Sequence, residues 1–152
     1  MVCIGLRATP KEVYYSIIRE KEDELEVEVI DKFIIPKALS VPDKLSYIHT
    51  LLFTVINEYS VEKAVLRRCE DNAQTKDTFR LYLEGVIQEL ISNCTISKYD
   101  ACKLSELGRL LGKKDKELKQ CVDGENIFEF DNWSFKKEER ESILCALAAI
   151  NL

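Results

Sequence analysis

The first 36 residues alternate between apolar and polar positions in short stretches, as β-strands with one solvated face do. In the clearest stretch, ELEVEVIDKFIIP, leucine and valine at 25, 27 and 29 alternate with glutamate at 24, 26 and 28. Two earlier stretches, VCIGLR and EVYYSIIRE, are also strand-like, and the connecting segments ATPKE and EKEDE are short. Three consecutive strands joined in this way predict an antiparallel meander.

The hydrophobic period changes after Pro42, where apolar residues recur every three or four positions. The stripe consists of Leu45, Ile48, Leu52, Val55, Ile56 and Tyr59. This spacing predicts a long amphipathic helix. The run KAVLRRC that follows lacks alternation, which predicts a central strand, and residues 77–91 then predict a second helix.

The remaining third of the chain predicts one more strand and further helices. We expect a short strand near CTIS at 94–97, a helix over 100–111 and a charged segment to about residue 120. The final stretch, SFKKEERESILCALAAINL, predicts a helix with Ser134 as its N-cap. A meander continued by alternating helices and strands requires a mixed sheet with helices on both faces, so the predicted fold class is α/β.

Length and composition favour one soluble domain over residues 1–152, since 46% of the residues are hydrophobic and 32% are charged. The apolar runs FII and ALAAI are far shorter than the roughly 20 residues that cross a bilayer, and the start MVCIGLRATP lacks the features of a signal peptide. We therefore expect a cytoplasmic protein without membrane association. The six cysteines are scattered singly among apolar neighbours, which favours reduced, buried thiols over disulfides or a zinc site.

The net charge of the chain bears on whether it binds nucleic acid. A formal net charge of -5 disfavours broad, non-specific affinity for nucleic acid, because phosphate binding depends on clustered lysine and arginine. A local basic groove stays open as an alternative, and its candidate residues are Arg68, Lys76, Arg80, Lys113 and Lys114. These side chains either form a solvated face or contact the phosphates of DNA or RNA.

The stretches CIGLR, AVLRRCED, FRLYLEGVIQELI and EERESILCALAAI follow one another in the order strand, strand, helix, helix. Together with the order of the elements, they resemble the RNase H-like superfamily and, within it, the RuvC-type Holliday-junction resolvases. That family has a glycine in its first strand, an acid after the apolar residues of its fourth strand, and two acids one turn apart in its last helix. The resemblance covers most of the chain and implies an RNase H-like fold.

The resemblance also implies a chemistry, phosphodiester hydrolysis assisted by two Mg²⁺ or Mn²⁺ ions that four carboxylates hold. On this chain the acid of the first strand falls on Arg7, and the acid of the fourth strand falls on Arg67. The paired acids of the last helix fall on Glu138 and Glu141, whose spacing of three puts them on one face. A shift of register in the fourth strand would instead bring Glu70, or the aspartate after it, to the site.

Three hypotheses follow from this correspondence. In the first, the guanidinium groups of Arg7 and Arg67 occupy the volume of the cations and pair with Glu138 and Glu141. In the second, both arginines end their strands in water, and the glutamates only favour the start of the helix through its dipole. In the third, Glu138, Glu141 and Glu70 are catalytic residues of a divalent-metal nuclease.

The first two hypotheses predict a catalytically degenerate RuvC-like protein that needs no cofactor and acts as a nucleic-acid-associated or protein-interaction module. The third predicts resolvase-like hydrolysis with Mg²⁺ or Mn²⁺ as the cofactor. The expected partners are DNA or RNA or another protein, and we expect a homodimer because relatives in the family often pair. The surroundings of Arg7 distinguish the first two hypotheses: its guanidinium group either meets Glu138 or Glu141 or points into water.

Overall fold

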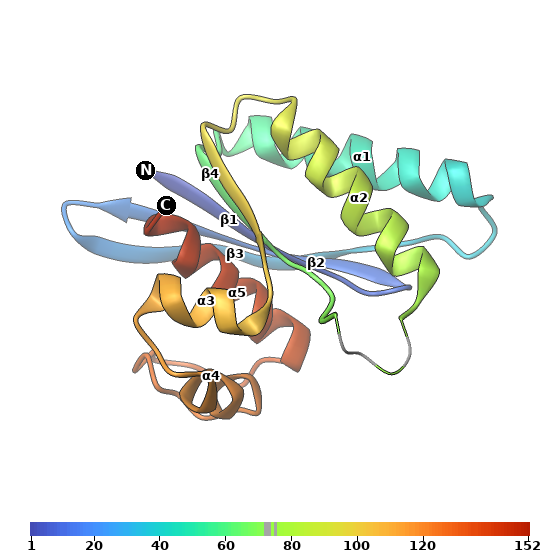
Figure 1. Cartoon of the computed structure of the whole chain (residues 1–152). Helices are drawn as coiled ribbons and strands as arrows, with labels where there is room; N and C mark the ends of the chain where they lie inside the picture. The colour runs from blue at the N-terminus through green and yellow to red at the C-terminus, as the bar shows by residue number, and fades with distance from the viewer. Residues whose placement is uncertain (72–73, 75) are drawn as a thin grey trace.

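A mixed sheet of five strands forms the centre of the structure, a computed structural model that describes residues 1–71, 74 and 76–152 (Figure 1). The strands are β1 (Val2–Ala8), β2 (Glu12–Lys21), β3 (Glu24–Ile34), β4 (Lys63–Arg67) and β5 (Lys98–Cys102). Their order across the sheet is β3-β2-β1-β4-β5. The first three strands pair antiparallel, whereas β4 runs parallel to β1 and β5 runs parallel to β4. The predicted meander and the mixed α/β sheet are confirmed.

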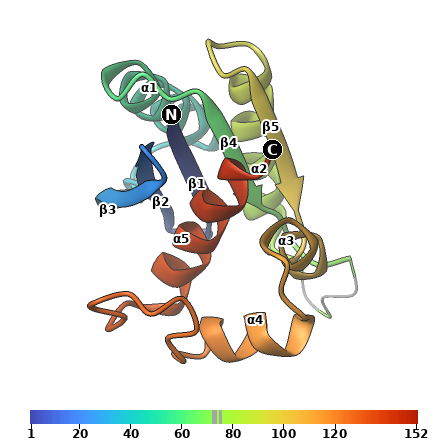
Figure 2. The ribbon, with the colours of Figure 1, turned by 90° about the vertical axis from the view of Figure 1, so that its left-hand side faces the viewer.

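Helices cover both faces of this sheet (Figure 2). One face carries α1 (Val41–Glu58) and α2 (Thr78–Ser92), and the other carries α3 (Leu104–Leu111), α4 (Asp115–Val122) and α5 (Lys137–Ile150). The alternation of each strand divides the apolar side chains between the two layers. Ile4 and Leu6 of β1 join the core under α1 and α2, whereas Cys3 joins the core under α5.

Local chemistry explains where several elements begin and end. Helix α1 begins after Ser40, whose hydroxyl accepts a hydrogen bond from the backbone N–H of Asp43, and a proline stands in its first turn. Strands β2 and β3 are joined by Glu22 and Asp23, which both have positive φ values, 52° and 66°. Left-handed conformations at both central residues match the twist of a two-residue hairpin.

Three boundaries differ from the sequence-based prediction. The strand expected near CTIS lies four residues later, and the helix expected from Asp100 begins only at Leu104, because Asp100 pairs with Val65 of β4. Residues 98–102, whose local pattern is ambiguous, therefore form a strand because they can pair with β4. The last helix is capped at Lys136 rather than at Ser134, since the Glu139 carboxylate accepts the backbone N–H of Lys136 at 2.7 Å.

Two further findings concern membranes and thiols. Over residues 1–71, 74 and 76–152, no helix has both the length and the apolar character needed to cross a bilayer. All six cysteines are unpaired, and Cys3, Cys102, Cys121 and Cys145 are buried.

Candidate functional site

Arg7 and Arg67 stand side by side at the carboxyl ends of two parallel strands. They are register partners in the pairing of β1 with β4, so their Cα atoms lie opposite one another. Both side chains point to the face of the sheet that α5 covers, and only 14% of the Arg7 side chain and 8% of the Arg67 side chain are exposed. Two guanidinium groups this deeply buried need acidic partners nearby.

The carboxylate of Glu141 on α5 is shared between them. The Nε of Arg7 donates a hydrogen bond to Oε2 of Glu141, and the Nε of Arg67 lies 3.7 Å from Oε1. The side chain of Glu141 is 5% exposed, so it is at least as buried as the arginines. One carboxylate therefore lies between two cations, and all three side chains are largely shielded from solvent.

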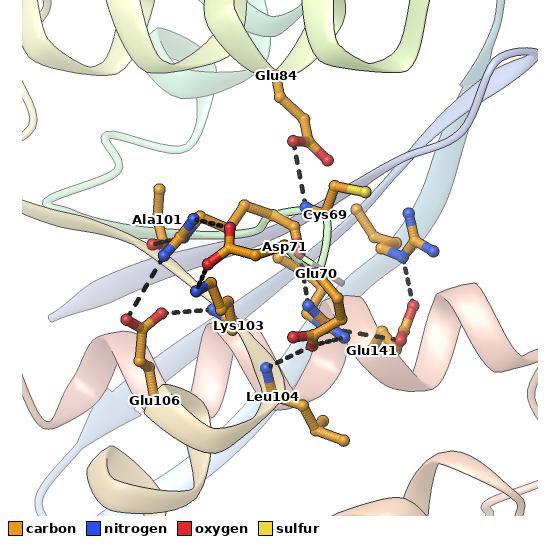
Figure 3. A network of polar contacts seen from close by, with 12 residues as sticks. Cys69, Glu70, Asp71, Glu84, Ala101, Lys103, Leu104, Glu106 and Glu141 are labelled. Atoms are coloured by element: carbon orange, nitrogen blue, oxygen red, sulfur yellow. Dashed lines mark hydrogen bonds and ion pairs between the residues drawn. The ribbon is translucent and has the colours of Figure 1, made fainter. Parts of the chain in front are cut away.

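Glu70 supplies the second negative charge. Its Oε1 accepts a hydrogen bond from Nη2 of Arg67 at 2.7 Å and another from the backbone N–H of Leu104 at 3.1 Å (Figure 3). The Nη1 of Arg67 also donates to the carbonyl oxygen of Arg68 at 2.5 Å. We call Arg7, Arg67, Glu70 and Glu141 the ion-pair cluster. It balances two positive and two negative charges and links the end of β4 to the start of α3.

Helix α5 can bring Glu141 to this place because residue 5 is glycine. A Cβ atom built on Gly5 would lie 1.9 Å from the carbonyl oxygen of Ser142 and 2.2 Å from the backbone nitrogen of Ala146. The helix therefore lies directly against the backbone of β1. Its rotation is fixed by Ser142, whose Oγ donates to the carbonyl oxygen of Glu139 and lies 2.6 Å from the Oγ of Ser16 on β2.

Glu138, expected beside Glu141, does not reach the arginines. It is half-buried one turn earlier on α5 and, within the described part of the chain, forms no ion pair with either arginine. It lies nearer to Tyr14, whose pKa is raised mainly by burial and by the Glu12 carboxylate, with a smaller contribution from Glu138. Of the two acids that the sequence placed on one helix face, Glu141 is the one that pairs with Arg7 and Arg67.

The candidate nucleic-acid contacts are scattered, and most of them have partners. Arg68 lies 3.6 Å from both Asp71 and Glu106, and it lines a pocket of about 600 Å³ together with Lys76. The Nε of Arg80 is hydrogen-bonded to the buried Glu84 at 2.9 Å. Because Asp71, Glu84 and Glu106 line this pocket as well as Arg68 and Lys76, it is mixed in charge rather than basic.

Lys113 and Lys114 lie elsewhere, in the connection between α3 and α4. The ammonium group of Lys113 stands 5.7 Å from the centre of the Phe128 ring, a cation–π distance. Lys114 is the residue before α4, and its backbone N–H donates to the Glu117 carboxylate at 2.8 Å. These two lysines therefore do not share a pocket with Arg68 and Lys76.

A second pocket, of about 420 Å³, opens over the ion-pair cluster. Its lining includes Arg67, Glu70 and Glu141 of the cluster, together with Lys119 of α4 and Lys137 of α5. From the sequence, Lys119 belongs to a basic segment that indicates either a solvated face or a phosphate contact, whereas Lys137 was not singled out because it sits in a mixed-charge stretch. Asp115 and Asp123 line the same pocket, so its wall carries both signs of charge.

The residues of the cluster do not fit a pair of divalent cations. Mg²⁺ and Mn²⁺ need several hard oxygen ligands and no competing positive charge. Here the two guanidinium groups stand at the ends of β1 and β4 and use the oxygens of Glu141 and Glu70. Among the side chains that the structure describes, no group of three or more His, Cys, Asp or Glu is arranged to hold a metal ion.

The architecture has clear counterparts among solved structures. Thermus thermophilus RuvC superimposes with a TM-score of 0.78 at 11% sequence identity, over 99% of this chain and 94% of that chain. The chain has the RNase H-like fold of RuvC. T. thermophilus RuvC in complex with a Holliday junction substrate gives a TM-score of 0.75 at 12% identity, again over 99% of this chain and 94% of that chain.

A viral resolvase has the same architecture. Fowlpox virus resolvase, in complex with Holliday junction DNA, gives a TM-score of 0.60 at 12% identity, over 97% of this chain and 95% of that chain. No protein-family model matches the chain, and no curated protein sequence matches it. The likeness to RuvC is therefore one of fold, and it spans nearly the full length of both chains.

Proposed function

We propose that this chain is a catalytically inactive RNase H-like module that associates with nucleic acid, in which the ion-pair cluster replaces a two-cation site. One observation carries the proposal. Arg7 and Arg67 lie at the ends of β1 and β4, where the RuvC-type resemblance calls for acids, and both face the buried carboxylate of Glu141.

Arginine is suited to this replacement. Its guanidinium group stays protonated at neutral pH. Its planar fork of N–H groups donates hydrogen bonds to carboxylate oxygens that would otherwise bind a metal ion. The same positive charges repel a divalent cation that approaches Glu141. A buried carboxylate without either partner would be strongly destabilising, so the arginines also stabilise the contact of α5 with the sheet.

Association with nucleic acid is supported by the fold and by the pocket over the cluster. The solved structures that share this fold include two described in complex with Holliday junctions. Lys119 and Lys137 line this pocket together with Arg67. Because the chain has a net charge of -5, we expect contacts with phosphates to be few and sensitive to salt.

A second candidate function is a protein-interaction module. It is favoured by the pairing of Arg68 with Asp71 and of Arg80 with Glu84, which neutralises side chains expected to face nucleic acid. The homodimer inferred from the family resemblance stays a prediction under either function. The enzyme alternative is a Mg²⁺- or Mn²⁺-dependent nuclease that uses Glu138, Glu141 and Glu70.

One set of assays separates these functions. Four-way junctions, single strands and duplexes are incubated with the protein in Mg²⁺ or Mn²⁺, and binding is followed by gel shift at increasing salt. We expect no cleavage, and we expect binding that weakens as salt rises. Cleavage that Glu138→Ala abolishes and Glu139→Ala leaves intact would instead establish a nuclease. Absence of salt-dependent binding to every substrate would favour the protein-interaction module.

A further inference from the structure

An apolar pocket lies at the opposite edge of the sheet from β5, away from the ion-pair cluster. It has a volume of about 350 Å³ and opens between β3 and the segment that precedes α5. Its apolar lining comes from Leu25, Val27 and Ile30 of β3 and from the aromatic side chains of Phe130, Trp133 and Phe135. Figure 2 shows the segment before α5 on the same side of the sheet as that helix.

A β-bulge in β3 explains why the strand presents three apolar side chains here. Ile17 of β2 pairs with Val29, whereas the next residue, Ile18, pairs with Val27, so Glu28 is the extra residue. Beyond this residue the alternation of faces is shifted by one position. Val27 and Ile30, three residues apart, consequently both contact the core under α5.

The opposite wall of the pocket is a rigid aromatic cluster. The rings of Phe130 and Trp133 stack with centroids 5.2 Å apart and planes 4° from parallel, and Phe135 meets Trp133 edge-on at 6.0 Å. The indole N–H of Trp133 donates to the carbonyl oxygen of Cys121 at 3.3 Å, which fixes the ring against α4. Such a preformed wall can receive an apolar side chain without rearranging.

The strand beside this pocket has a free edge. β3 is the outermost strand, so the backbone groups on its outer side lack a partner strand. The N–H of Lys32 is capped by the Asp31 carboxylate at 2.7 Å. Over residues 24–30, all of which the structure describes, no comparable cap is formed. The open part of the edge is thus the part next to the pocket.

The pocket and the strand edge beside it are acidic, although Glu24 and Glu26 lie opposite Lys21 and Arg19 of β2 in the strand register. Glu26 and Asp131 line the pocket, and Glu24 precedes them on the exposed edge. In the described part of the chain none of these three carboxylates forms an ion pair, whereas the carboxylate of Glu28 is held by Arg19 at 2.6 and 3.1 Å. An occupant with positive charge would therefore meet unpaired acids.

From these contacts we infer that the β3 edge binds a basic, extended segment of a partner protein by strand addition, with one apolar side chain inserted into the aromatic pocket. Strand addition satisfies the free backbone groups of β3, and the pocket selects the apolar residue. Leu25 and Val27 line the pocket, and Glu24 and Glu26 alternate with them along β3, with Glu26 lining the pocket as well. An added strand that alternates lysine with apolar residues therefore matches this alternation along β3.

The charge pattern favours such a partner over a second copy of this chain. Two β3 strands paired antiparallel over residues 24–28 would oppose glutamates to glutamates, and like charges directly opposite are destabilising. The inference does not depend on the ion-pair cluster, which lies at the ends of β1 and β4. It holds whether or not the proposed association with nucleic acid is correct.

The test uses the intrinsic fluorescence of Trp133, because the chain contains one tryptophan and it lies in the pocket. The probe is a seven-residue peptide in which lysine alternates with leucine around a central phenylalanine. We expect a saturable change of the Trp133 emission. The same peptide with glutamate in place of lysine, or with methylated backbone nitrogens, should bind at least about tenfold more weakly.

Matched variants assign the effect to this surface. Glu26→Lys should weaken binding by roughly threefold or more, whereas Glu58→Lys, on α1 across the sheet, should not change it. Leu25→Ala should weaken binding, whereas Ile34→Ala, also exposed on β3 but outside the pocket, should not. Circular dichroism of each variant checks that it is folded.

Three results would overturn the inference. One is equal affinity for the lysine and glutamate peptides, and another is undiminished affinity for the methylated peptide. The third is self-association of the free chain, measured by sedimentation. In this result Leu25→Ala abolishes the self-association, and the lysine peptide does not compete with it. This last result would assign the β3 edge to a second copy of the chain.

Discussion

Arg7 and Arg67 lie opposite one another on adjacent parallel strands, and the buried carboxylate of Glu141 lies against both of their guanidinium groups. This arrangement makes α5 dependent on two strands that are 60 residues apart in the chain. The cluster is neutral because Glu70 balances the second arginine, and in the proposed function it takes the place of a two-cation site.

The first prediction concerns the stability of this cluster. Glu141→Gln should lower the free energy of unfolding by about 3 kcal/mol, because it leaves two buried guanidinium groups short of an acid. Glu138→Gln, one turn earlier on α5, should change it by about 0.5 kcal/mol or less. Urea titration followed by circular dichroism measures both values. Equal losses in the two variants would contradict the central role of Glu141.

The second prediction is that metal binding can be gained. Arg7→Asp and Arg67→Glu together place two carboxylates beside Glu141 and remove both competing cations. In this double variant Mn²⁺ should raise the melting temperature, because an ion that binds only the folded state stabilises it. The unchanged chain should show no such rise.

A charge-matched control distinguishes a specific site from general attraction of cations. Arg109→Asp with Lys116→Glu changes the net charge by the same amount on the exposed surfaces of α3 and α4. Calorimetric titration with Mn²⁺ should detect saturable binding in the first double variant and not in the second. Saturable binding by the unchanged chain, lost with Glu141→Ala, would instead support the nuclease alternative.

The third prediction concerns the contact between α5 and β1. Gly5→Ala should cost about 3 kcal/mol or prevent folding, because the added methyl group would overlap the backbone of Ser142 and Ala146. Gly85→Ala is the control, since a methyl group there meets no atom within 4 Å and alanine favours the helix by about 1 kcal/mol. Thermal unfolding should show opposite shifts for the two variants.

The fourth prediction concerns thiol reactivity. Burial raises the pKa of Cys3 to about 11, of Cys102 to about 12 and of Cys121 to about 11, and it also raises the pKa of Cys145. At pH 8 these four thiols should stay protonated and react slowly with an aromatic disulfide reagent. The half-buried Cys69 and Cys94 should react first, and Cys69→Ser should remove one fast thiol. More than two fast thiols in the native protein would contradict the burial of this core.

The fifth prediction concerns acid stability. Hydrogen bonds from Tyr14 and Lys32 lower the pKa of Glu12 below its ordinary value of 4.5. A carboxyl whose pKa is lowered on folding stabilises the native state above its unfolded pKa, and this stabilisation is lost as the pH falls through the folded pKa. Glu12→Gln should therefore reduce the slope of unfolding free energy against pH below about 4.5. An unchanged slope would contradict the contribution of Glu12.

The sequence predicted the fold well because most elements carry their own local signal. The alternation of glutamate with leucine and valine in β3 and the three-to-four spacing of α1 are properties of each segment alone. The prediction was wrong where pairing between distant segments determines the secondary structure. Asp100 was expected to begin a helix, but it lies in β5 because it pairs with Val65 of β4. Short segments of mixed pattern adopt whichever state their neighbours stabilise.

The sequence also identified the types of residue in the cluster but not how they are joined. Arg7, Arg67 and the acids of the last helix could be named from the resemblance to RuvC-type proteins. That Glu141 contacts both arginines while Glu138 does not depends on the rotation and depth of α5, which Gly5 and the Ser16–Ser142 contact set. These are contacts between segments more than a hundred residues apart.

The aromatic pocket beside β3 also depends partly on local sequence and partly on tertiary structure. The stretch FEFDNWSF shows that aromatic residues gather before the last helix, and the alternating glutamates show that β3 is acidic on one side. Only the tertiary structure places Trp133 opposite Val27 and shifts the faces of β3 at Glu28. Local sequence determines which face of an element is apolar, whereas the packing of distant elements decides which apolar faces meet and which stay open.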